Sequence, residues 1–171
     1  MLQWKQITVR KKDNEMAKYG FLSVLEEEMD KYFQYDYAMD WDKKNHAVEV
    51  TFILEAQNKE AIETIDDSGE VTQDDIVFED YVLFYNPAKS QFEAEDYLVT
   101  IPFDAKKGFS REFLAYFAQF LNDVAIEGHS DLMDFLADDS KVDFGLEWNA
   151  QAFEEGQQGL EEGKSYPYPR Y

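Results

Sequence analysis

The chain has 171 residues, no cysteine, and 37 acidic against 16 basic residues, a formal net charge of −21. Aromatic residues make up 16% of it, which excludes a wholly disordered acidic chain and suits one domain with a sizeable core. The absence of cysteine excludes disulfides, thiolate metal sites and cysteine nucleophiles. No apolar run approaches the roughly 18 residues of a membrane-spanning helix, and no secretory signal is recognisable. We therefore expect a cytoplasmic protein.

Residues 1–15 are predicted to be a translated leader outside the native domain. Lys11, Lys12 and Asp13 can be encoded by a purine-rich ribosome-binding sequence, placed where one would precede a start codon at Met16. A chain beginning at Met16 keeps 12 basic and 35 acidic residues, a net charge of −23. The predicted domain then covers residues 16–163, followed by a flexible Tyr/Pro tail over residues 164–171.

The first predicted elements are a helix and a β-hairpin. Apolar residues recur at three- and four-residue spacing between Tyr19 and Phe33, which predicts a helix. Residues 35–41 then alternate between aromatic or apolar and polar side chains, residues 42–45 have turn chemistry, and residues 48–55 alternate again. This pattern predicts two antiparallel strands.

A second hairpin is predicted after an acidic loop. Residues 60–80 contain nine acidic residues and no basic one, with a turn at residues 66–69. Residues 76–85 and 91–101 are expected to be antiparallel strands around a turn at residues 86–89. Pro102 is expected to end the second strand.

The last third of the chain is predicted to be mainly helical. Ser110 is expected to cap a helix that stops at Gly128, and Ser130 to cap a short third helix. Residues 144–148 alternate like a strand, and residues 150–162 show only a weak helical pattern. The expected fold class is α+β: an antiparallel sheet of four to five strands, in two hairpins, with helices packed on one face.

Two arrangements of catalytic residue types are interpreted as structural. A two-histidine metal site would need His46 and His129 to meet, and each is expected instead to be solvated at a turn or helix junction. His129, Ser130 and Asp131 are the residue types of a hydrolase triad, but consecutive side chains diverge whereas a triad converges. No glycine array matches a nucleotide-binding loop. No catalytic residue and no cofactor is therefore predicted.

Residues 64–75 match a calcium loop in part. With Gly69 at the sixth position of the loop, Asp66 occupies the third and Val71 the eighth, as the pattern requires. Thr64 replaces the first carboxylate and the shorter Asp75 replaces the bidentate Glu. The alternatives left open are a calcium site and a solvated acidic loop.

The clustering of the negative charge is the feature that points to function. Residues 122–163 hold twelve acidic residues and one basic residue, in addition to the acidic run at residues 60–80. Such fields repel nucleic acid and membranes and attract cations. The candidate interaction surface consists of Asp66, Asp67, Glu70, Asp74, Asp75, Asp131, Asp134, Asp138, Asp139 and Asp143.

Two functions are compatible with this charge. The first is a non-enzymatic adaptor or chaperone-like protein that binds basic or amphipathic protein segments. The alternative is a nucleic-acid mimic that inhibits a nuclease or DNA-binding protein. Charge that only keeps the protein soluble is the third possibility. The tail, Tyr166–Tyr171, is either a peptide ligand for another protein or a disordered end.

Three segments of the chain resemble an uncharacterised family of small acidic cytosolic proteins of lactic-acid bacteria and streptococci. The segments are Met16–Phe21, Asp40–Val50 and Val82–Asn86. The resemblance covers about residues 16–163 and implies a small cytosolic protein. No activity is assigned to that family, so no functional residue is carried over from it.

Overall fold

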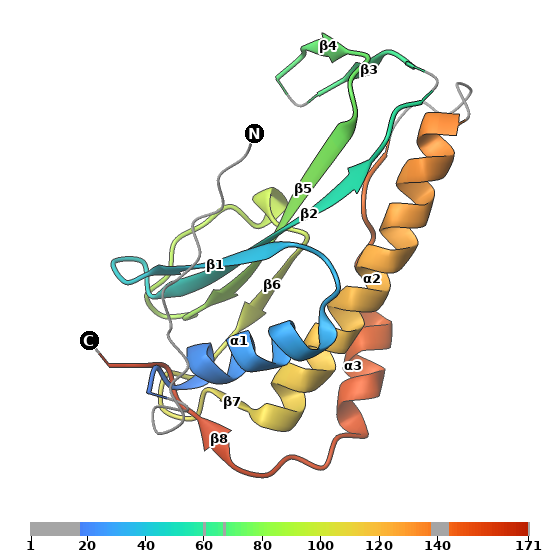
Figure 1. Cartoon of the computed structure of the whole chain (residues 1–171). Coiled ribbons are helices and arrows are strands. Elements are labelled where there is room, and N and C mark those ends of the chain that lie inside the picture. Colours follow the sequence, from blue (N-terminus) through green and yellow to red (C-terminus); the bar gives the residue numbers. More distant parts are fainter. Residues whose placement is uncertain (1–17, 60, 67, 138–143, 171) are drawn as a thin grey trace.

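The computed structural model describes residues 18–59, 61–66, 68–137 and 144–170. Its centre is a four-stranded sheet in the order β1-β2-β5-β6, formed by β1 (Tyr37–Asp42), β2 (Ala47–Ala56), β5 (Ile76–Tyr85) and β6 (Val99–Pro102). The helices are α1 (Phe21–Tyr32), α2 (Arg111–Ala137) and α3 (Ala150–Gln158), with a short 3-10 turn, η1 (Ala94–Asp96). Two small ribbons complete the fold: β3 (Thr64–Ile65) with β4 (Val71–Thr72), and β7 (Phe109–Ser110) with β8 (Ser165–Tyr166). Figure 1 shows these ribbons at opposite ends of the molecule. The α+β class and the four-stranded, mostly antiparallel sheet are confirmed.

The first predicted hairpin is present, formed by β1 and β2. Trp41 pairs with Val48 and Met39 with Val50, so the apolar side chains of both strands share one face of the sheet. On that face Phe84 of β5 contacts the ring of Phe21 in α1 at 6.2 Å and that of Phe117 in α2 at 5.1 Å between centroids. The core of the protein therefore lies where these two helices meet the sheet.

The second predicted hairpin is wrong. β5 has its expected bounds, but it pairs antiparallel with β2 along ten residues and parallel with β6. The residues expected to form the return strand instead include η1 and cross over before Val99, so that β6 runs in the same direction as β5. Pro102 ends β6, as expected, and lies on an edge strand.

α2 is one continuous helix, whereas two helices were expected. Ser110 caps it as expected, accepting a hydrogen bond from the N–H of Phe113 at 3.0 Å. Gly128 does not end the helix: it is buried within it, and a Cβ there would collide with the side chain of Leu146. The helix continues because Leu132 and Leu136 bury their side chains beyond the glycine. Ser130 is an exposed helical residue rather than a cap.

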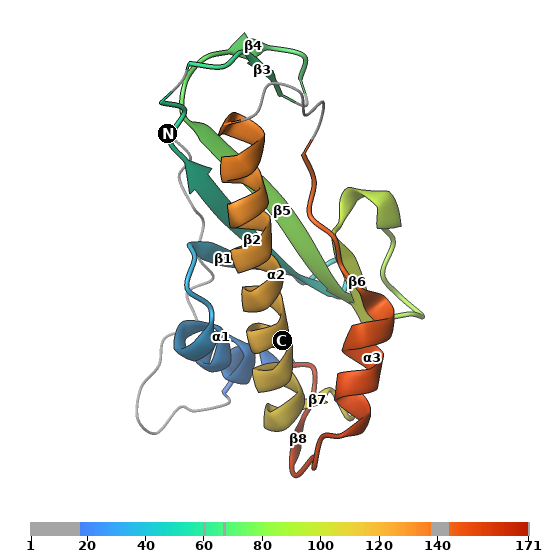
Figure 2. The ribbon, with the colours of Figure 1, turned by 90° about the vertical axis from the view of Figure 1, so that its right-hand side faces the viewer.

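The chain after residue 143 also differs from expectation. Residues 144–149 form no strand and run alongside β5 and α2, where the ring of Phe144 meets that of Phe78 at 4.8 Å. α3 is a regular helix because Asn149 caps it, accepting a hydrogen bond from the N–H of Ala152 at 3.0 Å, and because Phe153 is buried. Figure 2 shows α3 beside the first half of α2.

The tail was predicted to be flexible, and the structure packs it into the core. The Pro167 carbonyl accepts a hydrogen bond from the N–H of Phe21 at 3.0 Å. The ring of Tyr168 is 8% exposed and stacks on Phe103 at 4.9 Å. Gly20, with φ +54°, allows this approach, because a Cβ there would meet the Pro167 carbonyl oxygen. None of the helices in the described ranges is long and apolar enough to cross a membrane.

Candidate functional site

Part of each acidic segment lies at one end of the molecule. The β3–β4 hairpin and the C-terminal end of α2 lie side by side in both views (Figures 1 and 2). We call this region the acidic end. Its described, exposed carboxylates are Asp66, Glu70, Asp74, Asp75, Asp131 and Asp134. Asp67, Asp138, Asp139 and Asp143 lie outside the described residues.

Two of these carboxylates have structural roles. Asp66 Oδ1 accepts hydrogen bonds from the Ser68 hydroxyl at 2.6 Å and from the N–H groups of Ser68 and Glu70 at 2.9 Å, which lowers its pKa below the usual range. Asp75 Oδ1 accepts from the N–H of Asn58 at 2.8 Å and closes the base of the hairpin. Both carboxylates therefore stabilise the backbone conformation of the acidic end and contribute to its negative charge.

The other carboxylates form no ion pair in the described part of the chain. There, the ion pairs join Arg111 to Glu27 and Glu28, on α2 and α1, far from the acidic end in Figure 1. Glu70, Asp74, Asp131 and Asp134 belong to no ion pair within those same ranges. The charges of these four carboxylates are therefore unpaired within the described ranges.

The calcium-loop interpretation is not supported. Thr64 and Thr72 face each other across the β3–β4 ribbon, and the segment lies between strands β2 and β5 rather than between helices. One carboxylate oxygen of Asp66 already accepts a hydrogen bond from the N–H of Ser68 within the turn. Over residues 18–59, 61–66, 68–137 and 144–170, no group of three or more His, Asp or Glu is placed to hold a metal ion.

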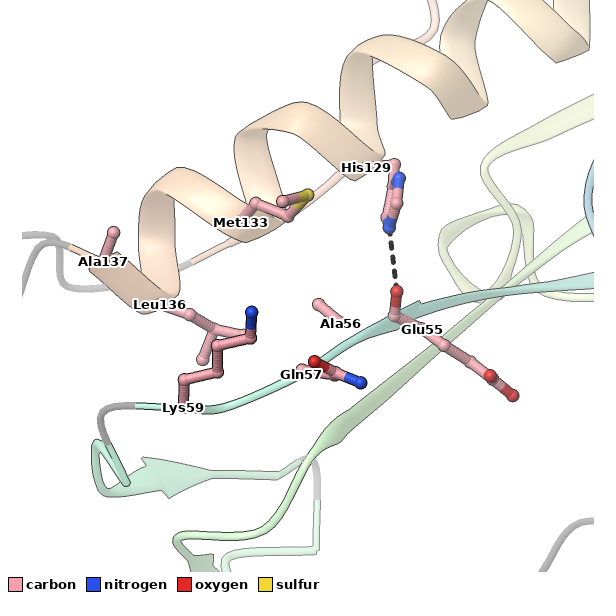
Figure 3. Close-up of a pocket in the computed structure, with 8 residues that line it drawn as sticks. All are labelled: Glu55, Ala56, Gln57, Lys59, His129, Met133, Leu136 and Ala137. Atoms are coloured by element: carbon pink, nitrogen blue, oxygen red, sulfur yellow. Dashed lines mark hydrogen bonds between the residues drawn. The ribbon is translucent and has the colours of Figure 1, made fainter.

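An apolar groove opens beside the acidic end, between the end of β2 and the last turns of α2 (Figure 3). Its volume is about 430 Å³. Ala56 and Leu136 are buried and form its floor, while Met133 is 54% exposed and forms a wall. Figure 3 shows the Lys59 amine beside Leu136 and the Glu55 carboxylate turned away from the groove. Gln57, His129 and Ala137 complete the lining.

His129 braces the groove rather than forming a reactive site. Its Nε2 lies 2.8 Å from the Glu55 carbonyl oxygen (Figure 3), and because a carbonyl only accepts, Nε2 carries the proton. Its ring also meets that of Tyr35 at 5.6 Å. His46 lies in the β1–β2 turn and packs against Tyr168, so the two histidines belong to separate regions. His129, Ser130 and Asp131 follow one another on a helix and do not converge.

Exposed apolar side chains accompany the charge. Ile65 and Val71 face each other across the β3–β4 ribbon and are 73% and 60% exposed. Val77, at the start of β5, is also exposed. The sequence analysis did not predict that these three side chains are exposed, and it did not predict the groove. The exposed Ile65–Val71 pair follows only from the hairpin register, and the groove only from the packing of α2 against the end of β2.

Comparisons with known proteins agree with this fold and assign it no activity. Residues 16–170 match a family described as "Protein of unknown function (DUF3013)". The chain belongs to this family. The match begins at Met16, so residues 1–15 lie outside it. The translated leader stays a prediction.

A similar solved structure is described as the crystal structure of a conserved protein of unknown function from Enterococcus faecalis. It is 38% identical, covers 96% of this chain and 100% of its own chain, and has a TM-score of 0.77. None of the curated proteins matches the chain.

Proposed function

We propose that this member of the DUF3013 family is a non-enzymatic cytoplasmic protein that binds a cationic, amphipathic segment of another protein. The apolar side of the segment would fill the groove between β2 and α2. Its lysine or arginine side chains would lie over the acidic end. The observation that carries the proposal is the position of an exposed apolar groove beside exposed carboxylates that form no ion pair within the described ranges.

The groove supports an apolar anchor. Met133 and the floor residues Ala56 and Leu136 offer a concave surface that a leucine- or phenylalanine-sized side chain can fill. Methionine adapts its shape to different partners, because its side chain is unbranched and polarisable. Burying such an anchor stabilises a complex by roughly 1.5–3 kcal/mol per side chain.

The charge supports a basic partner. Asp131 and Asp134 lie on the same last turns of α2 as Met133 and Leu136, and Glu70 and Asp74 lie on the neighbouring hairpin. A net charge of −21 steers cations to this surface and repels polyanions. A nucleic-acid mimic needs only the charge, so the apolar groove favours the polypeptide partner over the mimic.

Binding of a designed peptide tests the proposal. The probe is a fluorescent peptide of leucine and lysine with the spacing of an amphipathic helix, and its anisotropy reports binding at low and high salt. We expect saturable binding that weakens with salt, because the charges are exposed. A peptide with glutamate in place of lysine is expected not to bind.

Two pairs of variants separate groove from charge. Met133→Asp is expected to weaken binding about tenfold, whereas Met133→Leu keeps an apolar wall and binds normally. Asp131→Asn with Asp134→Asn is expected to weaken binding and to reduce its salt dependence. Asp123→Asn removes an exposed charge earlier on α2 and serves as the matched control. Equal effects of Asp123→Asn and the Asp131/Asp134 variant would contradict a role of the acidic end, and normal binding by Met133→Asp would contradict the groove.

A further inference from the structure

A second pocket lies on another side of the molecule, where three segments distant in sequence meet. Its volume is about 340 Å³. The start of β5 contributes Phe78 and Asp80, η1 and the residues after it contribute residues 95–98, and the stretch before α3 contributes residues 144–146 and Trp148. Figure 2 shows these three segments together, beside the edge of the sheet. None of them lines the groove of the proposed function.

Aromatic rings line this pocket, and other aromatic rings pack against them. Phe78 and Phe144 meet edge to face at 4.8 Å. Trp148 is supported by Phe120 at 4.8 Å and by Phe153 at 5.0 Å. Phe78, Phe144 and Trp148 are partly exposed and line the pocket, while Phe120 and the buried Phe153 pack against Trp148 without lining it. The aromatic wall is therefore preformed.

The pocket is also anionic. Asp80, Glu95 and Asp96 line it, and none of its ten lining residues is basic. Asp80 is oriented by its own β5 backbone, since its Oδ1 accepts a hydrogen bond from the N–H of Tyr81 at 2.8 Å. Glu95 and Asp96 are exposed on η1. Exposed carboxylates on η1 and aromatic rings from the other two segments thus line the same pocket.

We propose that this pocket binds an arginine side chain of a partner polypeptide. A guanidinium group stacks on aromatic faces and donates paired hydrogen bonds to carboxylates, the two kinds of surface that the pocket combines. An ammonium group is more strongly hydrated and has no planar face, so lysine fits the aromatic wall less well. The inference goes beyond the proposed function and does not require the groove to bind anything.

Titration of the full chain with short peptides tests the arginine site. The probe is a blocked Gly-Arg-Gly peptide, compared with the same peptide carrying lysine or citrulline. Binding is followed by NMR through the indole N–H resonance of Trp148, assigned with Trp148→Phe. The indole of Trp41, on β1, does not line the pocket and serves as an internal control.

We expect the arginine peptide to shift the Trp148 resonance saturably and to leave that of Trp41 in place. The lysine peptide is expected to bind several-fold more weakly, and the uncharged citrulline peptide at least tenfold more weakly. The proposal would be overturned if the lysine or the citrulline peptide bound as tightly as the arginine peptide. It would also be overturned if the arginine peptide gave no saturable shift.

Variants locate the charge that matters. Glu95→Gln with Asp96→Asn changes only exposed side chains and is expected to weaken arginine binding about tenfold without unfolding the protein. Glu93→Gln removes an exposed carboxylate from the same loop that does not line the pocket, and is expected to bind normally. Equal losses in the two variants would show a general charge effect and overturn the site. Met133→Asp, in the groove, is expected to leave this titration unchanged, so the two proposals fail separately.

Discussion

Trp41 donates a hydrogen bond from its indole Nε1 to the hydroxyl oxygen of Tyr168, 2.7 Å away and 127 residues later in the chain. The two rings also pack edge to face at 6.1 Å. A residue near the end of the chain thus fastens the tail to the first hairpin. The tail is therefore part of the folding unit, although its sequence has the composition of a mobile end.

Substitution of Tyr168 tests this attachment. Tyr168→Ala removes a buried ring from beside Phe103 and is expected to lower the free energy of unfolding by about 3–5 kcal/mol. Tyr168→Phe keeps the ring and loses the hydrogen bond to Trp41, at a cost of about 1 kcal/mol. Urea unfolding measures both changes. Arg170→Ala, exposed two residues later, is the control. If Tyr168→Ala costs no more than Arg170→Ala, the tail is not packed in solution.

Features that depend on residues close together in the sequence were predicted correctly, and features that depend on contacts between distant residues were missed. The β1–β2 hairpin was predicted because its alternation and its turn lie within neighbouring residues. The parallel pairing of β6 with β5 was missed because the residues Val99–Pro102 do not indicate whether a strand pairs parallel or antiparallel. The burial of Tyr168 was missed for the same reason, since its contacts lie near Gly20, Trp41 and Phe103.

Glycine and serine were misinterpreted in α2 because local rules treat them as boundaries. Gly128 was expected to end a helix, but it is the position where Leu146 crosses the helix closely. For the candidate site, the acidic segments were predicted from composition, and the structure places part of each at one end of the molecule. The groove and the arginine pocket were not predicted, because each is made of side chains from separate elements.

Gly128→Ala tests the close crossing. In an exposed helix this change would stabilise by about 1 kcal/mol. Here the new methyl group collides with Leu146, and overpacking is expected to cost about 1–3 kcal/mol. Leu146→Ala in the same chain should relieve the collision, so the double variant is expected to be more stable than the sum of the single effects. Thermal unfolding measures the cycle.

Gly145→Ala is the matched control for that cycle, because a Cβ there would meet nothing within 4 Å. It is expected to leave stability unchanged or slightly raised. An equal loss in both glycine variants would argue against the crossing of Leu146 over α2.

Arg111 joins α1 to α2 through a partly buried ion pair. Its Nη1 lies 2.8 Å from Glu28 Oε1 and 2.8 Å from Glu27 Oε2, and the Glu28 side chain is only 5% exposed. Burial alone would lower the pKa of Arg111, but the hydrogen bonds from its guanidinium to Glu27 and Glu28 outweigh burial and raise it. Arg111 therefore stays charged, and its loss leaves Glu28 buried without a partner.

Arg111→Met is expected to destabilise the protein by about 2–4 kcal/mol, less than a fully buried pair because water reaches part of Arg111. Glu28→Gln in the same chain should recover a large part of that loss, since the unpaired charge is then removed. Lys31→Met deletes an exposed charge from α1 and is expected to change little. Strict additivity of Arg111→Met and Glu28→Gln in urea unfolding would contradict their coupling.

Glu49 lies among like charges on the sheet and is expected to cost stability at neutral pH. It pairs across the strands with Asp40 and stands near Glu79. Burial raises its pKa above the ordinary 4.5, and the charges of Asp40 and Glu79 raise it further, while hydrogen bonds from Thr51 and Tyr97 oppose the shift. The folded state thus holds this proton more tightly than the unfolded state, so stability falls as pH rises from 4.5 through the raised pKa.

Glu49→Gln removes that charge and keeps one of the two oxygens, so one of the hydrogen bonds donated by Thr51 to Oε1 and by Tyr97 to Oε2 retains its acceptor. At pH 7 we expect it to raise the free energy of unfolding by a few tenths to about 1 kcal/mol, the range for like charges directly opposite in a sheet. At a pH well below 4.5 Glu49 is protonated in both states, so the gain should disappear. Glu55→Gln makes the same change at an exposed position of β2, and thermal melts of both variants across this pH range provide the comparison. A gain that is independent of pH, or equal in both variants, would mean that the repulsion around Glu49 is not its source.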